Sequence, residues 1–235
     1  VQGVDLHNDA VHALMQQFRF VPEARLDDLM ISYASNGGGV GPHFDSYDVS
    51  LLQAHGKRRW RIGRQKDLTL RDDIPLKVLA QFEPEEEFVL EPGDMLYLPP
   101  KVPHHGVAVN PCLTISVGMR APSSAELIGD YLDDLIDGAD EAIRYHDEDL
   151  ALPKDAYEID AAAMARVVDA LNALRMNDPD RLGDWFGRFI TNYRSGGEVM
   201  SDGEPRSRIE VEWDLEHGAV LQRHPYTRVA WRRVY

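Results

Sequence analysis

The sequence predicts a mainly β fold with helices behind it, because the hydrophobic pattern changes once along the chain. Residues 26–120 hold short alternating or apolar runs separated by Gly and Pro, which is typical of an antiparallel sandwich or barrel. From residue 123 the apolar period lengthens to that of a helix. With 235 residues, of which 43% are hydrophobic, the chain can bury a core. We therefore expect a globular β-domain with smaller helical additions.

The predicted strands follow one another closely in the first half of the chain. A turn at Pro92-Gly93 divides one long run into two strands, and Gly56 marks the turn before another. The runs that carry the strands are LMISYA, YDVSLLQA, RRWRIG, EFVLEPGDMLYLPP and LTISVGM.

A helix is predicted directly after the β-unit. Ser123 and Glu126 have the spacing of a capping box, and Gly138 suits the end of the helix. Further helices are expected near residues 159–176 and 179–193, the latter with Asp178 as its cap. The apolar stripes of the first and third helices comprise Leu127, Ile128, Tyr131, Leu132, Leu135 and Ile136, and Leu182, Trp185, Phe186, Phe189 and Ile190.

These stripes are larger than three short helices can bury among themselves. The helical segment therefore either packs on the β-unit or meets a second copy of itself. Residues 194–208, RSGGEVMSDGEPRSR, are expected to be a flexible connector to a short strand-rich piece. Because the chain begins at a valine and ends in RVAWRRVY, which has a strand pattern, we expect that sequence is missing at both ends.

Composition restricts the kinds of site and partner. The single cysteine, Cys112, excludes an intramolecular disulfide and a thiolate-rich zinc site, so any metal must be held by His and carboxylate. The net charge of −15 opposes direct binding to nucleic acid and favours a cationic partner. Of that charge, −11 lies between Ser123 and Asp160, as a solvated helical face or as an acidic docking surface. Without a membrane-spanning run or signal-peptide pattern, we expect a cytoplasmic location and no membrane contact.

His43 and Asp45 form the first part of a candidate metal site. Residues i and i+2 of a strand face the same way, so this pair would project an imidazole and a carboxylate side by side. A lone His-x-Asp pair is more often a hydrogen-bonded surface pair, and a third ligand is needed. Prolines stiffen the loop before His104 and His105, and we favour His104 because Pro103 restricts its backbone. Two His and one carboxylate form the facial triad of non-haem Fe(II) oxygenases.

The strand RRWRIG supplies a candidate anion anchor. If Trp60 and Ile62 face inward, Arg58 faces inward with them, and Arg59 and Arg61 face outward. A buried guanidinium needs an anion, such as the far carboxylate of 2-oxoglutarate, or else a carboxylate of the protein itself.

The glycines of GGGVG, directly before His43, have two possible roles. The stretch lacks the GK[ST] ending and the following helix of a phosphate-binding loop, so that reading is rejected. The glycines either let a substrate backbone approach the metal closely or make a turn.

The chain resembles a known family over these motifs. DDLMISYASNGGGVGPHFDSYDVSLLQAHGKRRWRIG, LEPGDMLYLPPKVPHHGVAVN and ISVGMRAP are similar to the bacterial ribosomal oxygenases. These are Jumonji-C enzymes that hydroxylate an arginine of ribosomal protein number sixteen of the large subunit. The resemblance implies a double-stranded β-helix catalytic domain of the cupin type over residues 1–122, a helical dimerisation domain over 123–197, and a truncated winged-helix-like portion over 198–235.

The resemblance also implies the residues of the active site. The family's iron ligands fall on His43, Asp45 and His104, and its 2-oxoglutarate arginine falls on Arg58, in agreement with the strand argument. The expected partners are Fe(II), 2-oxoglutarate, a basic ribosomal protein and a second copy of the chain, without direct contact to nucleic acid.

Secondary contacts are less well defined by the resemblance. A serine of the family becomes Ala34 here, which leaves Ser32 as the nearer hydroxyl, and an asparagine of the late strand becomes Thr114. Both are expected to contact the cosubstrate. Tyr47, assigned to the same strand face as Asp45, and Asp48, which could hold a guanidinium, are the expected substrate contacts.

Two other functions fit the same residues. PGDMLYLPP followed by His is also typical of metal cupins of other enzyme classes, against which the inward Arg58 argues. The third possibility is a non-catalytic, dimeric, peptide-binding module, against which the complete triad argues.

Overall fold

The computed structural model describes residues 1–148, 150–152, 155, 157–192, 206–224 and 226–233. The chain divides into two compact units, one of residues 1–121 with 191–230 and the other of residues 122–190 with 231–235. Among the described residues, no helix is both long enough and apolar enough to cross a membrane.

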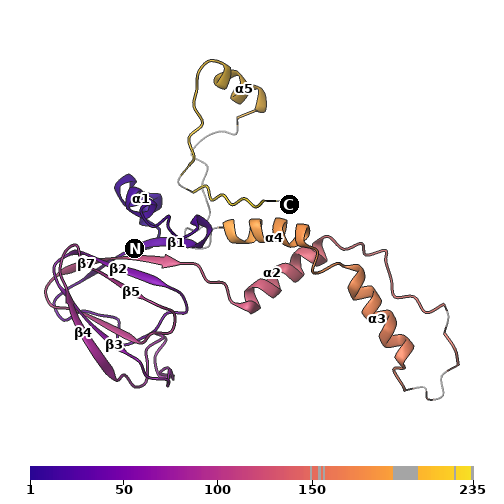
Figure 1. Ribbon diagram of the computed structural model, residues 1–235, viewed down its shortest axis with the longest axis horizontal. Coiled ribbons are helices and arrows are strands. Elements are labelled where there is room, and N and C mark those ends of the chain that lie inside the picture. The colour runs from indigo at the N-terminus through magenta and orange to yellow at the C-terminus, as the bar shows by residue number, and fades with distance from the viewer. Residues whose placement is uncertain (149, 153–154, 156, 193–205, 225, 234–235) are drawn as a thin grey trace. The chain divides into compact units, whose positions relative to one another are not determined.

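The first unit contains two antiparallel sheets (Figure 1). The four-stranded sheet has the order β1-β7-β2-β5, and the three-stranded sheet has the order β4-β3-β6. This arrangement confirms the predicted β-unit. Of its strands, β6 is the one that the predicted runs did not include. The strands are β1 (Leu26–Ala34), β2 (Val49–His55), β3 (Arg58–Gly63), β4 (Pro84–Leu90), β5 (Met95–Leu98), β6 (His104–Ala108) and β7 (Cys112–Met119).

Both sheets contribute side chains to the core of this unit. Val49 and Leu51 of β2 pack with Trp60 and Ile62 of β3, so alternate residues of strands from the two sheets share one apolar layer. A second apolar cluster joins helix α1 (Asp9–Gln16) to β1 and β7. Two short 3-10 helices, η1 (Val4–Leu6) and η2 (Glu23–Arg25), precede and follow α1.

Glycines allow the GGGVG loop to lie against β6. The Gly37 amide donates to the Ala108 carbonyl at 2.9 Å, and the Ala108 amide donates to the Gly38 carbonyl at 2.9 Å. A Cβ at Gly39 would lie 2.4 Å from the carbonyl oxygen of Gly106. The close approach in this structure is therefore between two segments of the same chain.

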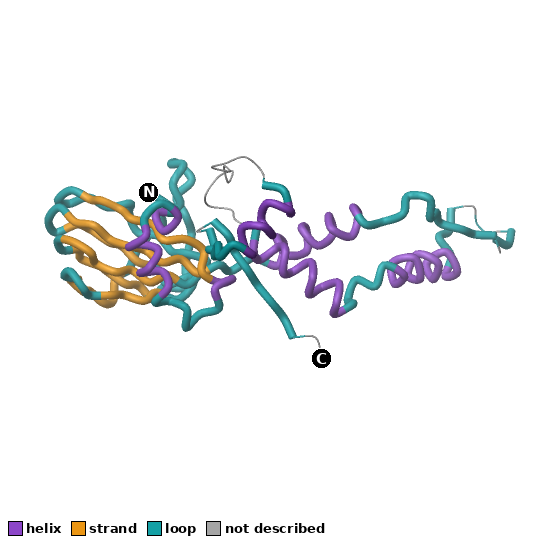
Figure 2. The backbone as a smooth tube through the Cα atoms, turned by 90° about the horizontal axis from the view of Figure 1, so that it is seen from above, coloured by secondary structure: helices purple, strands orange, loops and turns teal. Residues whose placement is uncertain are grey.

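The second unit has helices as its regular elements (Figure 2). They are α2 (Ser124–Asp137), α3 (Ala161–Ala173) and α4 (Pro179–Thr191). The predicted capping box of Ser123 and Glu126 is confirmed, and so is the cap of α4, where the Asp178 carboxylate accepts from the amides of Asp180 and Arg181. The sequence therefore determines where these helices begin.

The apolar stripes of α2 and α4 divide into a buried half and an exposed half. Trp185 lies 4.7 Å, centroid to centroid, from the ring of Tyr131, and its Nε1 donates to the Asp130 carboxylate at 2.8 Å. Ile128 and Ile136 of α2, by contrast, are 60% and 67% exposed. Only part of the apolar surface is thus used between the helices. The buried side chains of the two stripes are Tyr131, Leu135, Trp185, Phe189 and Ile190.

The C-terminal part differs from the prediction. Most of the expected connector, residues 194–208, lies outside the described residues. Residues 208–216 form a helix, α5 (Arg208–Glu216), and no strand occurs in the described residues after it. Ile209 to Leu215 alternate as in a strand, but a capping box of Ser207 and Glu210 favours the helix. The strand prediction for the described part of this segment is therefore wrong.

Candidate active site

His43, Asp45 and His104 come together within the first unit. Their ligand atoms all lie within 4.8 Å of one another, and Nε2 of His104 is 3.8 Å from Oδ2 of Asp45. The two histidines are joined by a pair of backbone hydrogen bonds, His43 N–H to His104 O at 2.9 Å and the reverse at 2.8 Å. Instead of the predicted strand, His43 alone forms a β-bridge, with His104, because Pro42 and the bend after Asp45 interrupt further pairing.

Backbone carbonyls determine which nitrogen of each histidine is free. Nδ1 of His43 lies 3.0 Å from the Gly41 carbonyl oxygen, and Nδ1 of His104 lies 2.9 Å from that of Val102. A carbonyl only accepts, so each Nδ1 carries the proton and each Nε2 keeps a lone pair for a metal. Burial, followed by the proximity of His43, lowers the pKa of His104 and favours the neutral imidazole that a metal needs.

His105 lies outside this cluster. Adjacent residues of a strand face opposite ways, so β6 buries His104, which is 2% exposed, and turns His105 away. The His105 ring instead lies edge-on to the ring of Phe82, at 6.1 Å between centroids.

Arg58 is buried, as the alternation of β3 predicts. Its side chain is on the core face with Trp60, and the guanidinium carbon lies 4.9 Å from the centroid of the Trp60 ring. Nη1 donates to Oγ1 of Thr114 and Nη2 to the carbonyl of Gly106, both at 3.3 Å, whereas Nε is buried without a partner. Burial lowers the pKa of Arg58. No carboxylate of the described residues pairs with this guanidinium, so the alternative of an internal ion pair does not apply.

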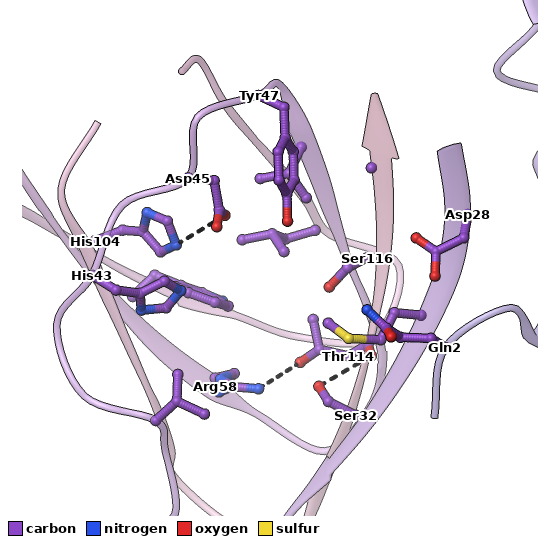
Figure 3. Close-up of a pocket in the computed structure, with 16 residues that line it drawn as sticks. Gln2, Asp28, Ser32, His43, Asp45, Tyr47, Arg58, His104, Thr114 and Ser116 are labelled. Atoms are coloured by element: carbon purple, nitrogen blue, oxygen red, sulfur yellow. Dashed lines mark hydrogen bonds and ion pairs between the residues drawn. The ribbon is translucent and has the colours of Figure 1, made fainter. Parts of the chain in front are cut away.

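A cavity of about 180 Å³ connects these groups (Figure 3). It is smaller than the roughly 300–1,000 Å³ of pockets for drug-sized ligands, and it suits a small organic acid. Ser32 and Thr114, which are paired across β1 and β7, line it as expected. The complete lining is Gln2, Asp28, Met30, Ser32, Val40, His43, Asp45, Tyr47, Val49, Leu51, Arg58, Trp60, His104, Thr114, Ser116 and Gly118.

Tyr47 and Asp28 line one wall of the cavity. Tyr47 lies in a bend before β2, not on a strand with Asp45 as predicted, yet its hydroxyl points into the cavity (Figure 3). Burial, with the nearby carboxylates of Asp45 and Asp28, raises the pKa of Tyr47 to about 12. Burial also raises the pKa of Asp28. The phenol is therefore neutral at pH 7.

Several lining residues were not among the expected site residues. Asp28, Met30 and Ser32 alternate along β1, and Ser116 follows Thr114 at the same spacing on β7. Extending the period-two pattern from Ser32 and Thr114 would have found them. Gln2 has no such signal, because only the tertiary structure brings the first residues to this cavity.

Asp48 does not line the cavity. Its carboxylate accepts a hydrogen bond from the Tyr97 hydroxyl and lies 3.9 Å from Nη2 of Arg25. The carboxylate is thus already engaged within the chain, and its expected role in holding a guanidinium is not supported.

The residues fit the metal and the acid that the sequence predicts. Two imidazoles and one carboxylate at one cavity are the ligand set of non-haem Fe(II). The Arg58 guanidinium lines the same cavity without a carboxylate partner among the described residues. A buried positive charge of this kind needs an anion, such as a carboxylate of the acid.

Gly106→Ala is expected to destabilise the first unit. A Cβ at this position would lie 2.6 Å from Cζ3 of Trp60 and 2.7 Å from Nε of Arg58, in a layer without spare room. Such overpacking costs about 1–3 kcal/mol, which a denaturant titration measures. Gly129→Ala in α2, where nothing lies within 4 Å, is the control and should not lower stability. An unfolding midpoint of Gly106→Ala equal to that of the unmodified protein would contradict this packing.

Comparison with known proteins agrees with this geometry. The family model described as JmjC domain matches residues 13–127, and the ROXA-like winged helix matches residues 173–235. The ribosomal protein uL16 3-hydroxylase of Escherichia coli K12 is 38% identical over 95% of this chain and 60% of its own length. A probable ribosomal oxygenase of Haemophilus influenzae is 38% identical over 65% of this chain and 36% of its own length.

Solved structures give the same result. An X-ray structure of E. coli YcfD superposes with a TM-score of 0.81 at 36% identity, over 93% of this chain and 59% of that one. A second, of the E. coli ribosomal oxygenase YcfD in complex with cobalt and 2-oxoglutarate, has a TM-score of 0.76 at 34% identity, over 92% and 56% of the two chains. The present chain thus spans about 60% of the length of its E. coli relative.

Proposed function

We propose that this chain is a JmjC-domain ribosomal oxygenase, dependent on Fe(II) and 2-oxoglutarate, that hydroxylates an arginine of a large-subunit ribosomal protein. The observation that carries the proposal is that one cavity holds both a His-Asp-His group and a buried, unpaired arginine. The YcfD complex with cobalt and 2-oxoglutarate supports the choice of cosubstrate.

His43, Asp45 and His104 would hold the iron, and Arg58 would receive the far carboxylate of 2-oxoglutarate. The bound metal and cosubstrate together supply the oxidising power for C–H hydroxylation by dioxygen. The chain orients these groups: carbonyls of Gly41 and Val102 hold the imidazoles, and Thr114 and Gly106 hold the guanidinium.

The Asp28 carboxyl group in the cavity lining supports a cationic substrate side chain. The Asp28 carboxylate lies on the same wall as the neutral Tyr47 phenol, and the Gln2 amide and Ser116 hydroxyl also line the cavity (Figure 3). Carboxylates attract a guanidinium and can pair with it in a bidentate manner. An arginine of a basic ribosomal protein fits this wall better than an acidic or apolar side chain does.

The test combines the purified protein with Fe(II), 2-oxoglutarate and ribosomal proteins. We expect one added oxygen atom on an arginine, located by peptide mass spectrometry, together with succinate in equal amount. Succinate formation without a modified arginine would support the oxygenase activity but contradict arginine as the substrate. No succinate and no metal binding would favour the peptide-binding module, and turnover independent of 2-oxoglutarate would favour another class of metal cupin.

We further propose that the second unit forms a homodimer. Ile128, Leu132 and Ile136 repeat every four residues along one exposed face of α2, and Phe186 of α4 is also exposed. Part of the apolar stripe therefore stays exposed in the single chain. The resemblance implies that a second copy of the chain covers it. A patch of this kind is rarely left uncovered on a soluble monomer.

The dimer is expected to dissociate when Ile128 and Ile136 are both replaced with Glu. Two buried like charges on each copy disfavour the interface but leave the buried Trp185 and Phe189 in place, so the helices stay folded. Light scattering should show a mass halved, with an unchanged circular dichroism spectrum. Glu at Trp185 is the contrast and should unfold the helices, because that side chain is buried within one chain. A monomer for the unmodified protein at micromolar concentration would refute the dimer.

A further inference from the structure

Gln53 of β2 is a fully buried polar side chain that lies behind the candidate active site. It is 0% exposed and does not line the cavity. Its neighbours on the same face of β2, Val49 and Leu51, belong to the apolar core. An amide at such a position is costly unless every polar atom is satisfied, so its partners indicate what it does.

Backbone carbonyls determine the orientation of the Gln53 amide. Nε2 donates to the carbonyl of His55 at 2.8 Å and to that of Gly56 at 3.4 Å, at the turn between β2 and β3. Because carbonyls only accept, the nitrogen must face the turn and Oε1 must face the other way. Oε1 lies 3.2 Å from Oγ1 of Thr114, on the paired strand β7.

The Thr114 hydroxyl transmits this orientation to Arg58. With its proton directed to Oε1 of Gln53, Oγ1 presents a lone pair to Nη1 of Arg58 at 3.3 Å (Figure 3). The Gly106 carbonyl accepts from Nη2 at 3.3 Å. Two of the five guanidinium N–H groups are thereby engaged with the protein, in a side chain that also lines the cavity.

We propose that Gln53 is a positioning residue for the 2-oxo acid site: acting through Thr114, it holds the Arg58 guanidinium in the rotation that receives a carboxylate. The inference rests on the proposed function. Without the Gln53 carbonyl oxygen, the Thr114 hydroxyl has no acceptor that fixes its proton, so its lone pair is no longer held toward Nη1 of Arg58. The guanidinium then loses a partner and its fixed rotation, which the incoming acid must restore at the expense of affinity.

The test measures affinity and not turnover. Calorimetry of 2-oxoglutarate binding to the protein loaded with Co(II) is carried out for the unmodified protein, Gln53→Leu, Thr114→Val and the double variant. Gln53→Leu and Thr114→Val are each expected to weaken binding roughly tenfold, because each removes one hydrogen bond in a chain that ends at a charged group. Since both act through one chain, the double variant should be no weaker than the weaker single variant.

Two further variants separate positioning from general destabilisation. Thr114→Ser keeps the hydroxyl and should restore near-normal affinity. Ser50→Ala removes a buried hydroxyl from β2 outside the cavity lining, and should leave affinity unchanged even where the thermal midpoint falls. Circular dichroism establishes that each variant is folded, and if Gln53→Leu is not, Thr114→Val carries the test.

The outcomes distinguish the two proposals. If the unmodified protein does not bind 2-oxoglutarate, the proposed function fails and the positioning role fails with it. If the unmodified protein binds but Gln53→Leu and Thr114→Val bind equally well, only the positioning role is overturned. Effects that add fully in the double variant also overturn it, because they would show two independent contributions.

Discussion

His104→Ala is expected to reduce turnover at least a hundredfold while the protein stays folded. The variant removes one of the three proposed metal ligands, and the loss of an inner ligand exceeds the 10- to 100-fold effects typical of outer groups. His43→Ala and Asp45→Ala should behave in the same way. Succinate formation gives the rate, and calorimetry with Co(II) gives the metal affinity.

His105→Ala is the matched control for this experiment. His105 is adjacent in sequence but faces away from the ligand cluster, so its removal should change turnover little. Near-normal activity of His104→Ala together with an inactive His105→Ala would show that the third ligand is wrongly assigned. Because His104 is almost fully buried, circular dichroism of the alanine variant must accompany the rate.

Arg58→Ala is expected to raise the apparent 2-oxoglutarate requirement steeply. Removing one partner of a buried charge pair costs about 2–5 kcal/mol, which corresponds to roughly 30- to 5,000-fold in the dissociation constant. Arg58 is 6% exposed and has no carboxylate partner among the described residues, so the ion pair that the substitution removes would be the one with the acid. The dependence of succinate formation on 2-oxoglutarate concentration measures the effect.

Arg59→Ala is the control for Arg58→Ala. Arg59 lies on the outer face of β3, where its Nε is 3.1 Å from a carboxylate oxygen of Glu87, and exposed pairs of this kind contribute little. We expect an unchanged 2-oxoglutarate requirement. Equal effects of the two substitutions would contradict the inward register of Arg58.

The sequence alone determined those features that depend on neighbouring residues. The caps at Ser123 and Asp178, the inward side of β3 and the choice of His104 over His105 follow from local hydrogen bonding and from the alternation of strands. The same local reasoning failed where two local patterns compete, as between the alternation of residues 209–215 and the capping box at Ser207. It also failed at Asp45 and Tyr47, which were expected on one face of a strand but lie outside the strands, Tyr47 in a bend.

Only the tertiary structure decided which distant residues share the cavity and which polar groups are already satisfied. Gln2 reaches the cavity through the path of the N-terminus, and the Asp48 carboxylate is engaged by contacts with Tyr97 and Arg25. Gln53 is linked to Arg58 through Thr114 only because the pairing of β2 with β7 places Gln53 opposite Thr114. The physical reason is that local patterns set the face of a strand or helix on which a side chain lies, whereas its partner across a sheet depends on register, which the packing of the whole core determines.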